Sequence, residues 1–507
     1  MKLAEFISIL DRPDVQGSLG CEVTGLTCDS RTIAPGMVFV AIRGLQQDGH
    51  QYVEQAMARG AAAAVVEKKR SYGSSQTRSC VIQVKDTRKA LSALAHQFYG
   101  RPSHRMGLIG VTGTNGKTTT TYLIKGILEA AGKKVGLLGT VNYHVGQEVL
   151  SPSHTTPESL DLHRLLARMV EAGVEYTVME VSSHALALER VADCAYDVGI
   201  FTNLTQDHLD FHGSLDNYFA AKLKFFVNLG EKNPKLFPRR ALVNLEDPRA
   251  DRVIASTQVP SWTYGYGRQA DLSTENLHMA FEGIRFFAQT PKGKFEIHST
   301  LTGRYNVSNI LAAIGAALSQ DIPIAVIQKG IRETHQIPGR FEKIEEGQDF
   351  LVVVDYAHTD DALQKLLLAV KELRVARSAG GRILTVFGCG GDRDRGKRPK
   401  MGRVATELSD LVILTSDNPR TEDPMDIIRG IEAGIQQGPD SRGQQAEYLI
   451  IPNRSEAIEK AIRLARGGDI VMIAGKGHEN YQIIEDRKLH FDDREVARGI
   501  LRRLRTK

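Results

Sequence analysis

The sequence predicts an α/β protein of several domains built on parallel sheets, and three observations lead to this class. Short apolar runs alternate with stretches of helical periodicity along nearly the whole chain, which is the pattern of strand–helix–strand units. The 507 residues are enough for three or four domains at about 100–200 residues each. Hydrophobic residues make up 42% of the chain and charged residues 25%, a composition that excludes the disordered and fibrous classes.

Charge and cysteine usage narrow the expected surroundings and partners. A net charge of +5 does not predict nucleic-acid binding, which needs lysine and arginine clustered on one face. No apolar run approaches the roughly 18 residues of a membrane span, and Met1–Leu10 lacks the long apolar core of a signal peptide. The five cysteines include no CxxC pair, which argues against a disulfide framework or a zinc ribbon. We expect a cytoplasmic monomer with neither nucleic-acid nor membrane partners.

The first hundred residues predict a small α/β domain. Strands are expected at Met37–Ile42, Ala61–Val66 and Cys80–Val84, and a helix is expected at His50–Arg59. The segment Tyr99-Gly100-Arg101-Pro102-Ser103 is rich in turn residues and marks the first boundary. The N-terminal domain is therefore expected at residues 1–103.

The middle of the chain predicts a larger α/β domain at residues 104–337. A strand at Met106–Val111 leads into a helix at Thr118–Ala131, which Gly132 ends in the usual C-terminal position. Further strands are expected at Val135–Leu138, Tyr176–Val181, Asp197–Leu204 and Ala241–Leu245. Between Leu272 and Leu301 alternating residues and turn signals predict an antiparallel patch, and the helix Asn306–Leu318 follows it.

The last third of the chain predicts a Rossmann-like domain at residues 338–507, after the boundary at Ile337-Pro338-Gly339. Apolar strands alternate there with helices, as in a parallel doubly wound sheet. The strands are Leu351–Asp355, Ile383–Phe387, Leu411–Thr415, Tyr448–Ile451 and Ile470–Ala474. The chain shows no internal repeat, which excludes solenoids and propellers.

The strongest local signal is the segment Gly110–Thr120, which reads Gly-Val-Thr-Gly-Thr-Asn-Gly-Lys-Thr-Thr-Thr. A predicted strand precedes it and a predicted helix follows, which is the context that a P-loop requires. Backbone amides of such a loop attract phosphate oxygens, Lys117 adds a full positive charge, and the Thr118 hydroxyl can hold Mg²⁺. Val111 departs from the strict pattern, which has glycine at that position. The segment predicts a nucleoside triphosphate site.

Motifs along the whole chain resemble the ATP-dependent amide ligases that build the stem peptide of peptidoglycan. They are Asp29-Ser30-Arg31, Asp48-Gly49-His50, Gly113–Thr119, His154–Glu158, Met179–His184, Phe201–Leu204, Asp207–Gly213, Gly303–Asn306, Pro338–Arg340, Asp355–His358 and Asp417–Arg420. The resemblance implies three domains: an N-terminal domain for the UDP-linked substrate, a central ATP-binding domain with the P-loop, and a C-terminal domain for the incoming amino acid.

The resemblance also implies the chemistry and the catalytic residues. In the family the γ-phosphoryl group of ATP is transferred to a carboxylate, and an amine then attacks the acyl phosphate and releases phosphate. Bringing two anions together calls for metal ions and a lysine. Lys117, Glu180, His208 and Lys222 match the catalytic positions, and Thr118, Glu180, His208 and Lys222 match those that hold Mg²⁺. From the residues alone, Glu180 could equally cap the turn that follows its strand, and His208 could be structural.

Lys222 can be placed by a helical-wheel argument. In the helix expected over Asn217–Val227 the apolar stripe is Phe219, Leu223 and Phe226. At about 100° per residue Lys222 falls at the edge of that stripe, whereas Lys224 falls on the opposite side. An inward lysine is biased toward the neutral amine, the form that captures CO₂. In the family the matching lysine is carbamylated; from the sequence alone, a buried or snorkelling lysine is the more general interpretation.

Further residues match the family's ligand positions. The ATP positions are Gly113, Thr114, Asn115, Gly116, Lys117, Thr118, Thr119, Asn306, Arg340 and Asp355, and those of the UDP-muramoyl dipeptide are Ser30, Thr155, Thr156, Ser182 and Arg190. The guanidinium of Arg190 offers a bidentate fork to an anion. Leu188 stands where the family has a glutamine-type residue, so this position offers no hydrogen bond to the substrate.

The loop Asp417-Asn418-Pro419-Arg420 bears on which amino acid is added. Diaminopimelate differs from lysine by one distal carboxylate, which a guanidinium such as that of Arg420 can bind with paired hydrogen bonds. Lysine-adding relatives lack this arginine, so the resemblance implies meso-diaminopimelate as the substrate. Arg393, Asp417, Asn418, Pro419, Arg420, Gly475 and Glu479 match its binding positions, and Glu479 is expected to accept the distal ammonium.

Two other functions remain open from the sequence. A sister ligase on the same scaffold, such as a lysine-adding enzyme or a folylpolyglutamate synthetase, is disfavoured by Arg420 and by the UDP-type N-terminal motifs. A non-catalytic ATP-binding regulatory module is disfavoured because Lys117, Glu180 and Lys222 are all present.

Overall fold

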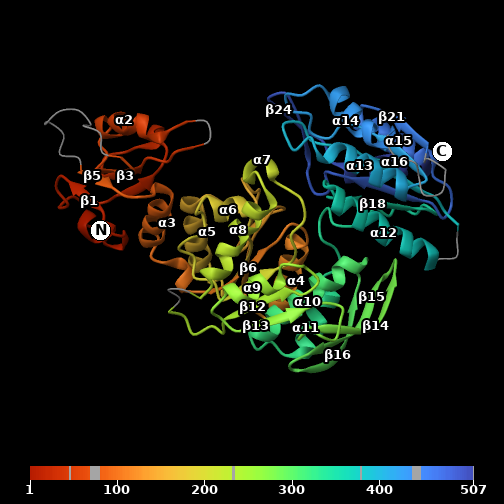
Figure 1. The fold of residues 1–507 in the computed structure, drawn as a ribbon, viewed down its shortest axis with the longest axis horizontal. Helices are drawn as coiled ribbons and strands as arrows, with labels where there is room; N and C mark the ends of the chain where they lie inside the picture. The colour runs from red at the N-terminus through yellow and green to blue at the C-terminus, as the bar shows by residue number, and fades with distance from the viewer. Residues whose placement is uncertain (45–46, 69–79, 231–233, 377–379, 437–446, 506–507) are drawn as a thin grey trace.

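The computed structural model describes residues 1–44, 47–68, 80–230, 234–376, 380–436 and 447–505. Figure 1 shows three α/β bodies, with the central one between the N-terminal and C-terminal ones. Each body is built around its own sheet, of five, eight and six strands in chain order. The expected class, an α/β chain with three sheet domains, is confirmed.

The N-terminal sheet contains four parallel strands and one antiparallel edge strand. Its order is β1-β5-β4-β3-β2, and β1 runs antiparallel to β5. The strands are β1 (Asp14–Gln16), β2 (Gly25–Thr27), β3 (Met37–Val40), β4 (Ala63–Val66) and β5 (Cys80–Gln83), and the helices α1 (Leu3–Phe6), α2 (Val53–Ala58) and α3 (Thr87–Phe98). The helix expected at His50–Arg59 begins instead as a 3₁₀ turn, Gly49–Tyr52, because the Asp48 carboxylate accepts the backbone N–H of His50.

The central sheet has the order β13-β12-β11-β6-β10-β7-β8-β9. Its first six strands are parallel, whereas β8 and β9 extend one edge as an antiparallel hairpin. The strands are β6 (Gly107–Thr112), β7 (Val135–Leu138), β8 (Tyr143–Val145), β9 (Glu148–Leu150), β10 (Tyr176–Glu180), β11 (Val198–Phe201), β12 (Arg240–Asn244) and β13 (Ser261–Tyr264). The sequence predicted the parallel core and not the hairpin.

Helices cover both faces of the central sheet. One face packs against α4 (Lys117–Ala130), α10 (Arg304–Ser319) and α11 (Ile324–Glu333). The other packs against α5 (Ser159–Glu171), α6 (Ser183–Ala187), α8 (Leu215–Val227) and α9 (Ala250–Ser256); the short α7 (Leu209–His212) precedes α8. Gly132 follows α4 with φ +75°, as expected for a glycine that ends a helix.

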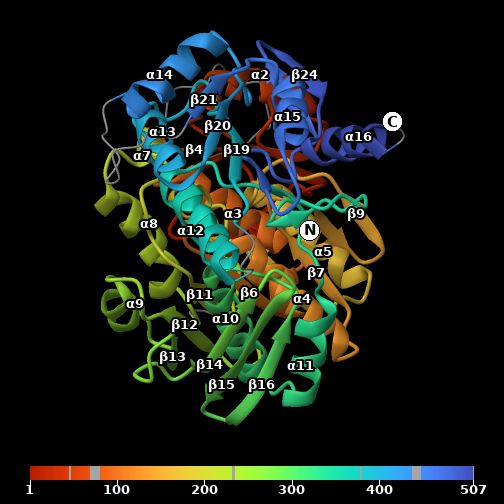
Figure 2. The ribbon, with the colours of Figure 1, turned by 90° about the vertical axis from the view of Figure 1, so that its right-hand side faces the viewer.

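The antiparallel patch expected between Leu272 and Leu301 is confirmed. It is the three-stranded sheet β14 (Ser273–Ala280), β15 (Gly283–Thr290) and β16 (Gly293–Ser299). Its apolar side, which includes Phe286 and Ile297, joins the core under α10 and α11. In Figure 2 this sheet forms the lower end of the molecule.

The C-terminal sheet has the order β17-β18-β22-β19-β20-β21, in which only the edge strand β17 is antiparallel. The strands are β17 (Glu342–Lys343), β18 (Leu351–Asp355), β19 (Ile383–Phe387), β20 (Leu411–Leu414), β21 (Glu447–Ile450) and β22 (Ile470–Ala474). The helices are α12 (Asp360–Ala376), α13 (Lys397–Leu408) and α14 (Pro424–Gln436) on one face, and α15 (Arg454–Leu464) and α16 (Asp493–Arg505) on the other. A hairpin, β23 (Tyr481–Ile484) and β24 (Arg487–His490), follows β22.

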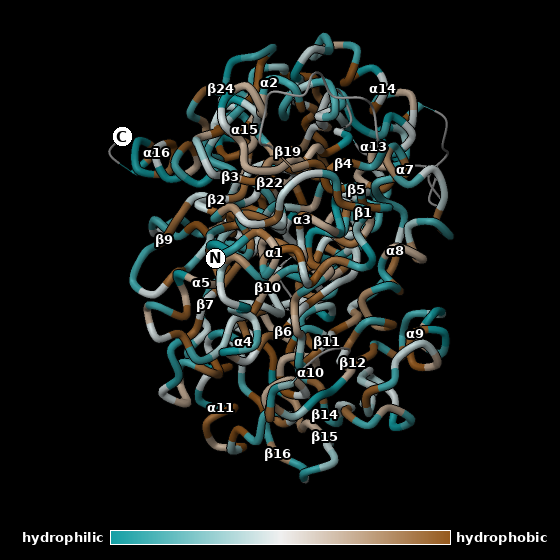
Figure 3. Tube along the Cα trace, turned by 90° about the vertical axis from the view of Figure 1, so that its left-hand side faces the viewer, coloured by the Kyte–Doolittle hydropathy of each residue, from teal (hydrophilic) through white to brown (hydrophobic). Residues whose placement is uncertain are grey.

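Hydropathy follows this layered arrangement. In Figure 3 hydrophobic stretches lie mainly in the interior strands, whereas α16 near the C-terminus is largely hydrophilic. Across the described ranges, no helix is both long enough and apolar enough to cross a membrane.

Candidate active site

A cavity of about 620 Å³ lies where the central and C-terminal bodies meet. The central body contributes the loops that follow β6, β10 and β11, and the C-terminal body contributes Arg340 just before β17, residues at the end of β18 and after it, and residues of α12. Carboxyl ends of parallel strands are the usual ligand-binding edge of such sheets. The cavity therefore lies where the sequence predicted nucleotide binding.

The P-loop has backbone conformations that require its glycines. Gly113 has φ +148°, and a Cβ there would lie 1.9 Å from the Thr202 hydroxyl oxygen. Gly116, with φ +87°, directly precedes α4. Val111, the departure from the strict pattern, lies inside β6 and is fully buried between β10 and β11. This position belongs to the sheet, so a side chain is tolerated there and the loop itself is intact.

Lys117 and Thr118 begin α4 at the floor of the cavity. The Lys117 Nζ donates to the carbonyl oxygens of Gly113 and Thr114, at 3.0 and 2.8 Å. The Thr118 hydroxyl donates to Glu180 Oε1 at 2.9 Å and accepts from Arg340 Nη2 at 3.0 Å. The P-loop hydroxyl is thus in contact with a carboxylate of the central body and a guanidinium of the C-terminal body.

Glu180 is the last residue of β10 and is 1% exposed. Its Oε1 also accepts the backbone N–H of Thr140 at 2.9 Å, and its Oε2 accepts the Thr140 hydroxyl at 3.0 Å. The capping role considered from the sequence is filled by Ser182, whose hydroxyl accepts the N–H of Ala185 at the start of α6. The Glu180 carboxylate is held toward Thr118 instead.

Lys222 is buried, as the helical wheel predicted, and is 1% exposed. Its Nζ donates to the Gly113 carbonyl at 2.9 Å and lies 4.6 Å from the ring centre of Tyr218. Burial and the nearby charge of Lys117 lower the pKa of Lys222 well below its usual value. Lys224, on the other side of α8, keeps 48% of its side chain exposed and pairs with Glu189.

Lys117 and Lys222 therefore donate to the same carbonyl oxygen, that of Gly113. Two ammonium groups on one acceptor repel each other, and this repulsion favours the neutral form of the more deeply buried amine.

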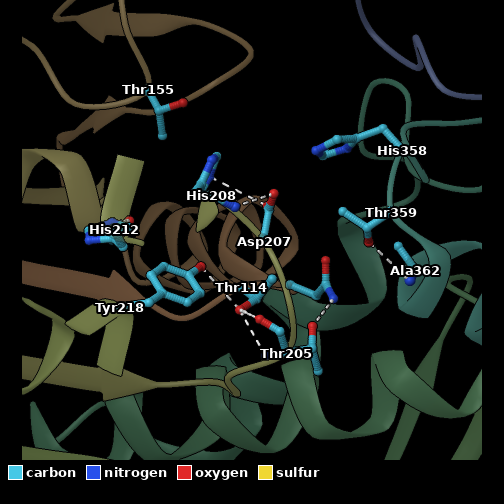
Figure 4. A network of polar contacts seen from close by, with 12 residues as sticks. Thr114, Thr155, Thr205, Asp207, His208, His212, Tyr218, His358, Thr359 and Ala362 are labelled. Atoms are coloured by element: carbon cyan, nitrogen blue, oxygen red, sulfur yellow. Dashed lines mark hydrogen bonds and ion pairs between the residues drawn. The ribbon is translucent and has the colours of Figure 1, made fainter. Parts of the chain in front are cut away.

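His208 stands beside Asp207 at the edge of the cavity, with its Nε2 3.4 Å from Asp207 Oδ2. Its φ of +53° is uncommon for a residue with a side chain. Partial desolvation lowers the pKa of His208 to about 3, so the ring is neutral and can act as a ligand. Figure 4 shows His208 and His358 facing each other from the two bodies, above Thr114 and its contact with Tyr218.

Not all of the nucleotide-binding positions that the resemblance implies line the cavity in the structure. Arg340 and Asp355 line the cavity, and the Asp355 carboxylate accepts the backbone N–H groups of Phe341 and Ala357. Burial raises the pKa of Asp355. Asn306 is not among the lining residues: its amide donates to the Thr302 carbonyl and accepts from Asn309. One helical turn further along α10, Asn309 lines the cavity in its place.

The residues matched to the UDP-muramoyl dipeptide lie on two bodies. Thr155 and Ser182 line the cavity, and the Thr156 hydroxyl donates to the Glu180 carbonyl at 2.8 Å. Arg190 donates to the Thr156 carbonyl at 3.0 Å and pairs with Glu158 at 2.5 Å, which leaves its buried Nε without a partner among the described residues. Ser30 lies in the N-terminal body, where its hydroxyl contacts Gln55. Leu188 is half-buried at the end of α6.

The residues matched to the amino acid lie at the carboxyl edge of the C-terminal sheet, after β19, β20 and β22. The Asn418 Nδ2 donates to Glu479 Oε2 at 2.9 Å, and Gly475, with φ +111°, leaves room for the Asp417 carboxylate. Pro419 is buried in the same loop, with its carbonyl against Gly391. Burial and the charge of Asp417 raise the pKa of Glu479.

Arg420 is the last residue of this loop and has a φ of +52°. Its Nη1 donates to the Gly391 carbonyl oxygen at 2.6 Å. Burial and the positive charge of Arg393 lower the pKa of Arg420. Arg393 itself is exposed and donates to the Asp392 carbonyl. Two guanidinium groups close enough to repel each other form a site suited to an anion.

Several residues of the site were not singled out from the sequence. Asp361, in the first turn of α12, accepts from Asn115 Nδ2 at 2.8 Å and from the Thr205 hydroxyl at 3.2 Å, across the two bodies. Thr140 holds Glu180, and Lys476 lies among the amino-acid residues. No local pattern marks Asp361 or Thr140, whereas Lys476 lies inside the matched stretch Gly475–Glu479.

The family implies Mg²⁺, and the donor chemistry can be tested against it. Among the described residues, no three His, Cys, Asp or Glu side chains converge as a metal cluster. The Thr118 hydroxyl and the Glu180 carboxylate do form a pair of oxygen donors, which Mg²⁺ prefers. The pair His208 and Lys222 fits the ion only if the lysine carries an anionic oxygen group, since an amine and an imidazole are poor magnesium ligands.

Known protein families match this chain along most of its length. The Mur ligase middle domain matches residues 111–317, the glutamate ligase domain of Mur ligases matches 339–477, and the catalytic domain of the Mur ligase family matches 22–99. The UDP-N-acetylmuramoyl-L-alanyl-D-glutamate–2,6-diaminopimelate ligase of Syntrophomonas wolfei is 45% identical over 502 residues, 99% of each chain. That of Geobacillus thermodenitrificans is 44% identical over 505 residues, with full coverage of both chains.

Solved structures agree as well. A structure of UDP-N-acetylmuramoyl-L-alanyl-D-glutamate–2,6-diaminopimelate ligase is similar with a TM-score of 0.69 and 32% identity, covering 100% of this chain and 99% of that one. The MurF ligase of Thermotoga maritima in complex with ADP has a TM-score of 0.60 at 17% identity, covers 94% and 96% of the two chains, and shows the shared fold. The chain belongs to the Mur ligase family.

Proposed function

We propose that this Mur ligase uses ATP to join meso-2,6-diaminopimelate to the γ-carboxylate of D-glutamate in UDP-N-acetylmuramoyl-L-alanyl-D-glutamate, a step in peptidoglycan precursor synthesis. Relatives with this activity in their names are 45% and 44% identical over essentially the full chain. The observation that carries the substrate assignment is the position of Arg420, beside Arg393 and in the same loop cluster as Glu479.

The distal end of diaminopimelate carries both a carboxylate and an ammonium group. Arg420 supplies a guanidinium for the carboxylate, and Glu479 supplies a carboxylate for the ammonium. Lysine would leave the Arg420 guanidinium without its anion, and a half-buried charge without a partner costs binding energy. The loop therefore selects diaminopimelate over lysine, and this selection disfavours the lysine-adding and folate-type alternatives.

In the first step the D-glutamate carboxylate attacks the γ-phosphorus of ATP. A P–O bond forms to the carboxylate oxygen, the bond to the β,γ-bridging oxygen breaks, and ADP leaves with the electron pair. Lys117, which rests on Gly113 and Thr114, turns toward the phosphate oxygens, while Arg340 stabilises the charge that develops on the transferred group. The backbone amides of residues 113–118 hold the phosphates.

In the second step the amine of diaminopimelate attacks the acyl carbon. The C–N bond forms, the nitrogen passes a proton to solvent, and the tetrahedral intermediate collapses as its C–O bond to phosphate breaks and inorganic phosphate leaves with the electron pair. The loops after β10 and β20 belong to different bodies, so the acyl phosphate and the amine must be brought together from two bodies. Holding both partners in position makes the attack effectively intramolecular.

Mg²⁺ bound at the site would neutralise phosphate charge and polarise the transferred phosphoryl group. Thr118 and Glu180 would hold one ion, and His208 with carbamylated Lys222 would hold a second. In carbamylation the neutral amine of Lys222 bonds to the carbon of CO₂ and releases a proton to solvent. The resulting carbamate is an anion, which relieves the repulsion with Lys117 at the Gly113 carbonyl. Burial of this amine in its neutral form supports the modification.

We place the boundaries between the three bodies near residues 103 and 337 and divide the ligands among them. The N-terminal body, with Ser30, binds the UDP part, and Thr155, Thr156, Ser182 and Arg190 bind the muramoyl dipeptide. The partnerless Nε of Arg190 supports its assignment to an anionic group of that substrate. The substrates are all small molecules, and we expect the enzyme to act as a monomer in the cytoplasm.

The test measures phosphate release from purified protein with ATP, Mg²⁺, the UDP-dipeptide and a panel of single amino acids. Release is expected only when both the dipeptide and diaminopimelate are present. The variant Lys117→Ala is the matched inactive control, because it removes the charge that positions the phosphates. Release that needs no amino acid, or that Lys117→Ala sustains at a near-normal rate, would overturn the proposal.

A further inference from the structure

Lys476 is a buried lysine in the middle of the proposed amino-acid site. It follows β22, its side chain is 0% exposed, and its Nζ is surrounded by oxygen acceptors. The nitrogen lies 3.1 Å from Glu479 Oε2, 3.1 Å from Asn418 Oδ1 and 3.4 Å from Asp417 Oδ1. The ring of Tyr481 lies on another side, with its centre 5.5 Å from Nζ. An ammonium group has three donors and no acceptor, so these contacts occupy it fully.

The Lys476 contact determines which way the Asn418 amide points. The Asn418 Oδ1 accepts from Lys476 Nζ and from the backbone N–H of Ile483 at 2.9 Å, which leaves Nδ2 to donate to Glu479 Oε2. Two donors on the oxygen exclude the flipped amide, because a flip would place an NH₂ group against both. The Glu479 carboxylate is held by the same two residues.

The charge of Lys476 also acts on the Glu479 carboxylate. Burial and the Asp417 charge raise the pKa of Glu479, whereas Lys476 and the Asn418 hydrogen bond oppose that rise. The titratable and charged groups that face Glu479 are Tyr356, Asp417, Arg420, Arg454, Lys476 and Tyr481. Of the cations among them, Lys476 is in direct contact with the carboxylate.

We propose that Lys476 is a positioning residue for the amino-acid substrate: it keeps Glu479 as a carboxylate and fixes the Asn418 amide, so that a preformed anion meets the distal ammonium of diaminopimelate. The inference rests on the proposed function, because Glu479 is there the acceptor of that ammonium. Lys476 acts through these neighbours and is fully enclosed by them.

The test is steady-state kinetics of Lys476→Met, Lys476→Gln and Lys476→Arg over a range of pH. Loss of the charge lets the pKa of Glu479 rise, so its protonation, and with it the rise in KM for diaminopimelate, starts at higher pH than in the parent. We expect Lys476→Met and Lys476→Gln to raise this KM about tenfold or more at neutral pH and further as the pH falls. The KM for ATP should change less than twofold, and Lys476→Arg should restore the parental pH profile because it keeps the charge.

The matched control is Lys235→Met in the central body. Lys235 is also buried, with a 2% exposed side chain, and pairs with Asp197 at 2.6 Å. The substitution Lys235→Met should destabilise the protein without moving the pH profile of the KM for diaminopimelate. An unchanged profile in folded Lys476→Met and Lys476→Gln would overturn the inference. Failure of both to fold while Lys235→Met folds would assign Lys476 to stability alone and would equally overturn it.

The outcome is separable from that of the proposed function. If the parent enzyme does not release phosphate with diaminopimelate, the proposed function fails before any variant is measured. If the parent is active, and Lys476→Met and Lys476→Gln show the parental KM for diaminopimelate at every pH, only the positioning role of Lys476 fails.

Discussion

At the scale of single residues, the chemistry depends on charges whose surroundings differ from water. Lys222 is enclosed by the P-loop carbonyl of Gly113 and the ring of Tyr218, which disfavours its cationic form. Arg420 is held near a second guanidinium, that of Arg393. Each arrangement is unfavourable without an anion, and the proposal places one at each: a carbamate on Lys222 and the substrate carboxylate at Arg420.

For Lys222 we expect that Lys222→Ala loses most activity and that short carboxylates such as acetate restore part of it, since they can replace the carbamate oxygens. The control is Lys224→Ala, because Lys224 lies on the exposed side of the same helix; it should keep full activity. High-resolution density for an unmodified Lys222 in an active, metal-loaded enzyme would contradict the carbamate.

For Arg420 we expect that Arg420→Ala raises the KM for diaminopimelate roughly 10²-fold, because charge-assisted hydrogen bonds contribute about 1.5–3 kcal/mol each. The KM for lysine should change far less, since lysine has no distal carboxylate, and that for ATP should not change. Steady-state kinetics on both amino acids check this. A variant that kept its preference for diaminopimelate would show that another residue selects the substrate.

At the scale of elements, the strand–loop–helix unit β6–α4 creates the phosphate site through its backbone. Gly113→Ala would place a Cβ against the Thr202 hydroxyl, so we expect it to deform the loop and to lower kcat/KM for ATP by about 10²-fold or more. The control is Gly132→Ala: Gly132 also has positive φ but no atom near its Cβ, so it should cost about 1 kcal/mol of stability at unchanged turnover. Equal effects on turnover would contradict a specific role for the loop.

The sequence was informative for the elements whose signals are local. The apolar runs, the P-loop between strand and helix, the inward side of α8 at Lys222 and the antiparallel strands near Leu272–Leu301 all follow from period and turn chemistry. The hairpins β8–β9 and β23–β24 did not follow, since short half-exposed strands carry little apolar periodicity. Which of Asn306 and Asn309 lines the cavity depends on how α10 is rotated about its axis. A motif match does not specify that rotation.

At the scale of the whole molecule, the nucleotide cavity lies where two bodies meet. Asn115 and Asp361 are 246 positions apart in the chain, yet their side chains are hydrogen-bonded at 2.8 Å. Arg340 and Thr118 meet across the same junction. No sequence period predicts such pairs, and this is why Asp361 was found only in the structure.

For the junction we expect that Asp361→Ala raises the KM for ATP by about fivefold to 10²-fold, because two hydrogen bonds to the P-loop side are lost at roughly 0.5–1.5 kcal/mol each. The control is Asp360→Ala, which removes the same charge from the same helical turn and should leave this KM unchanged. Equal effects of the two substitutions would show that helix electrostatics, and not the contact between the bodies, is responsible.

The most direct test of the central claim is the product formed when diaminopimelate and lysine compete. Purified enzyme is supplied with ATP, Mg²⁺, the UDP-dipeptide and equal concentrations of both amino acids, and the tripeptide products are separated by mass spectrometry. We expect the diaminopimelate product to exceed the lysine product by about 10²-fold or more, because only diaminopimelate satisfies Arg420. Comparable amounts of the two products, or a lysine product alone, would contradict the account.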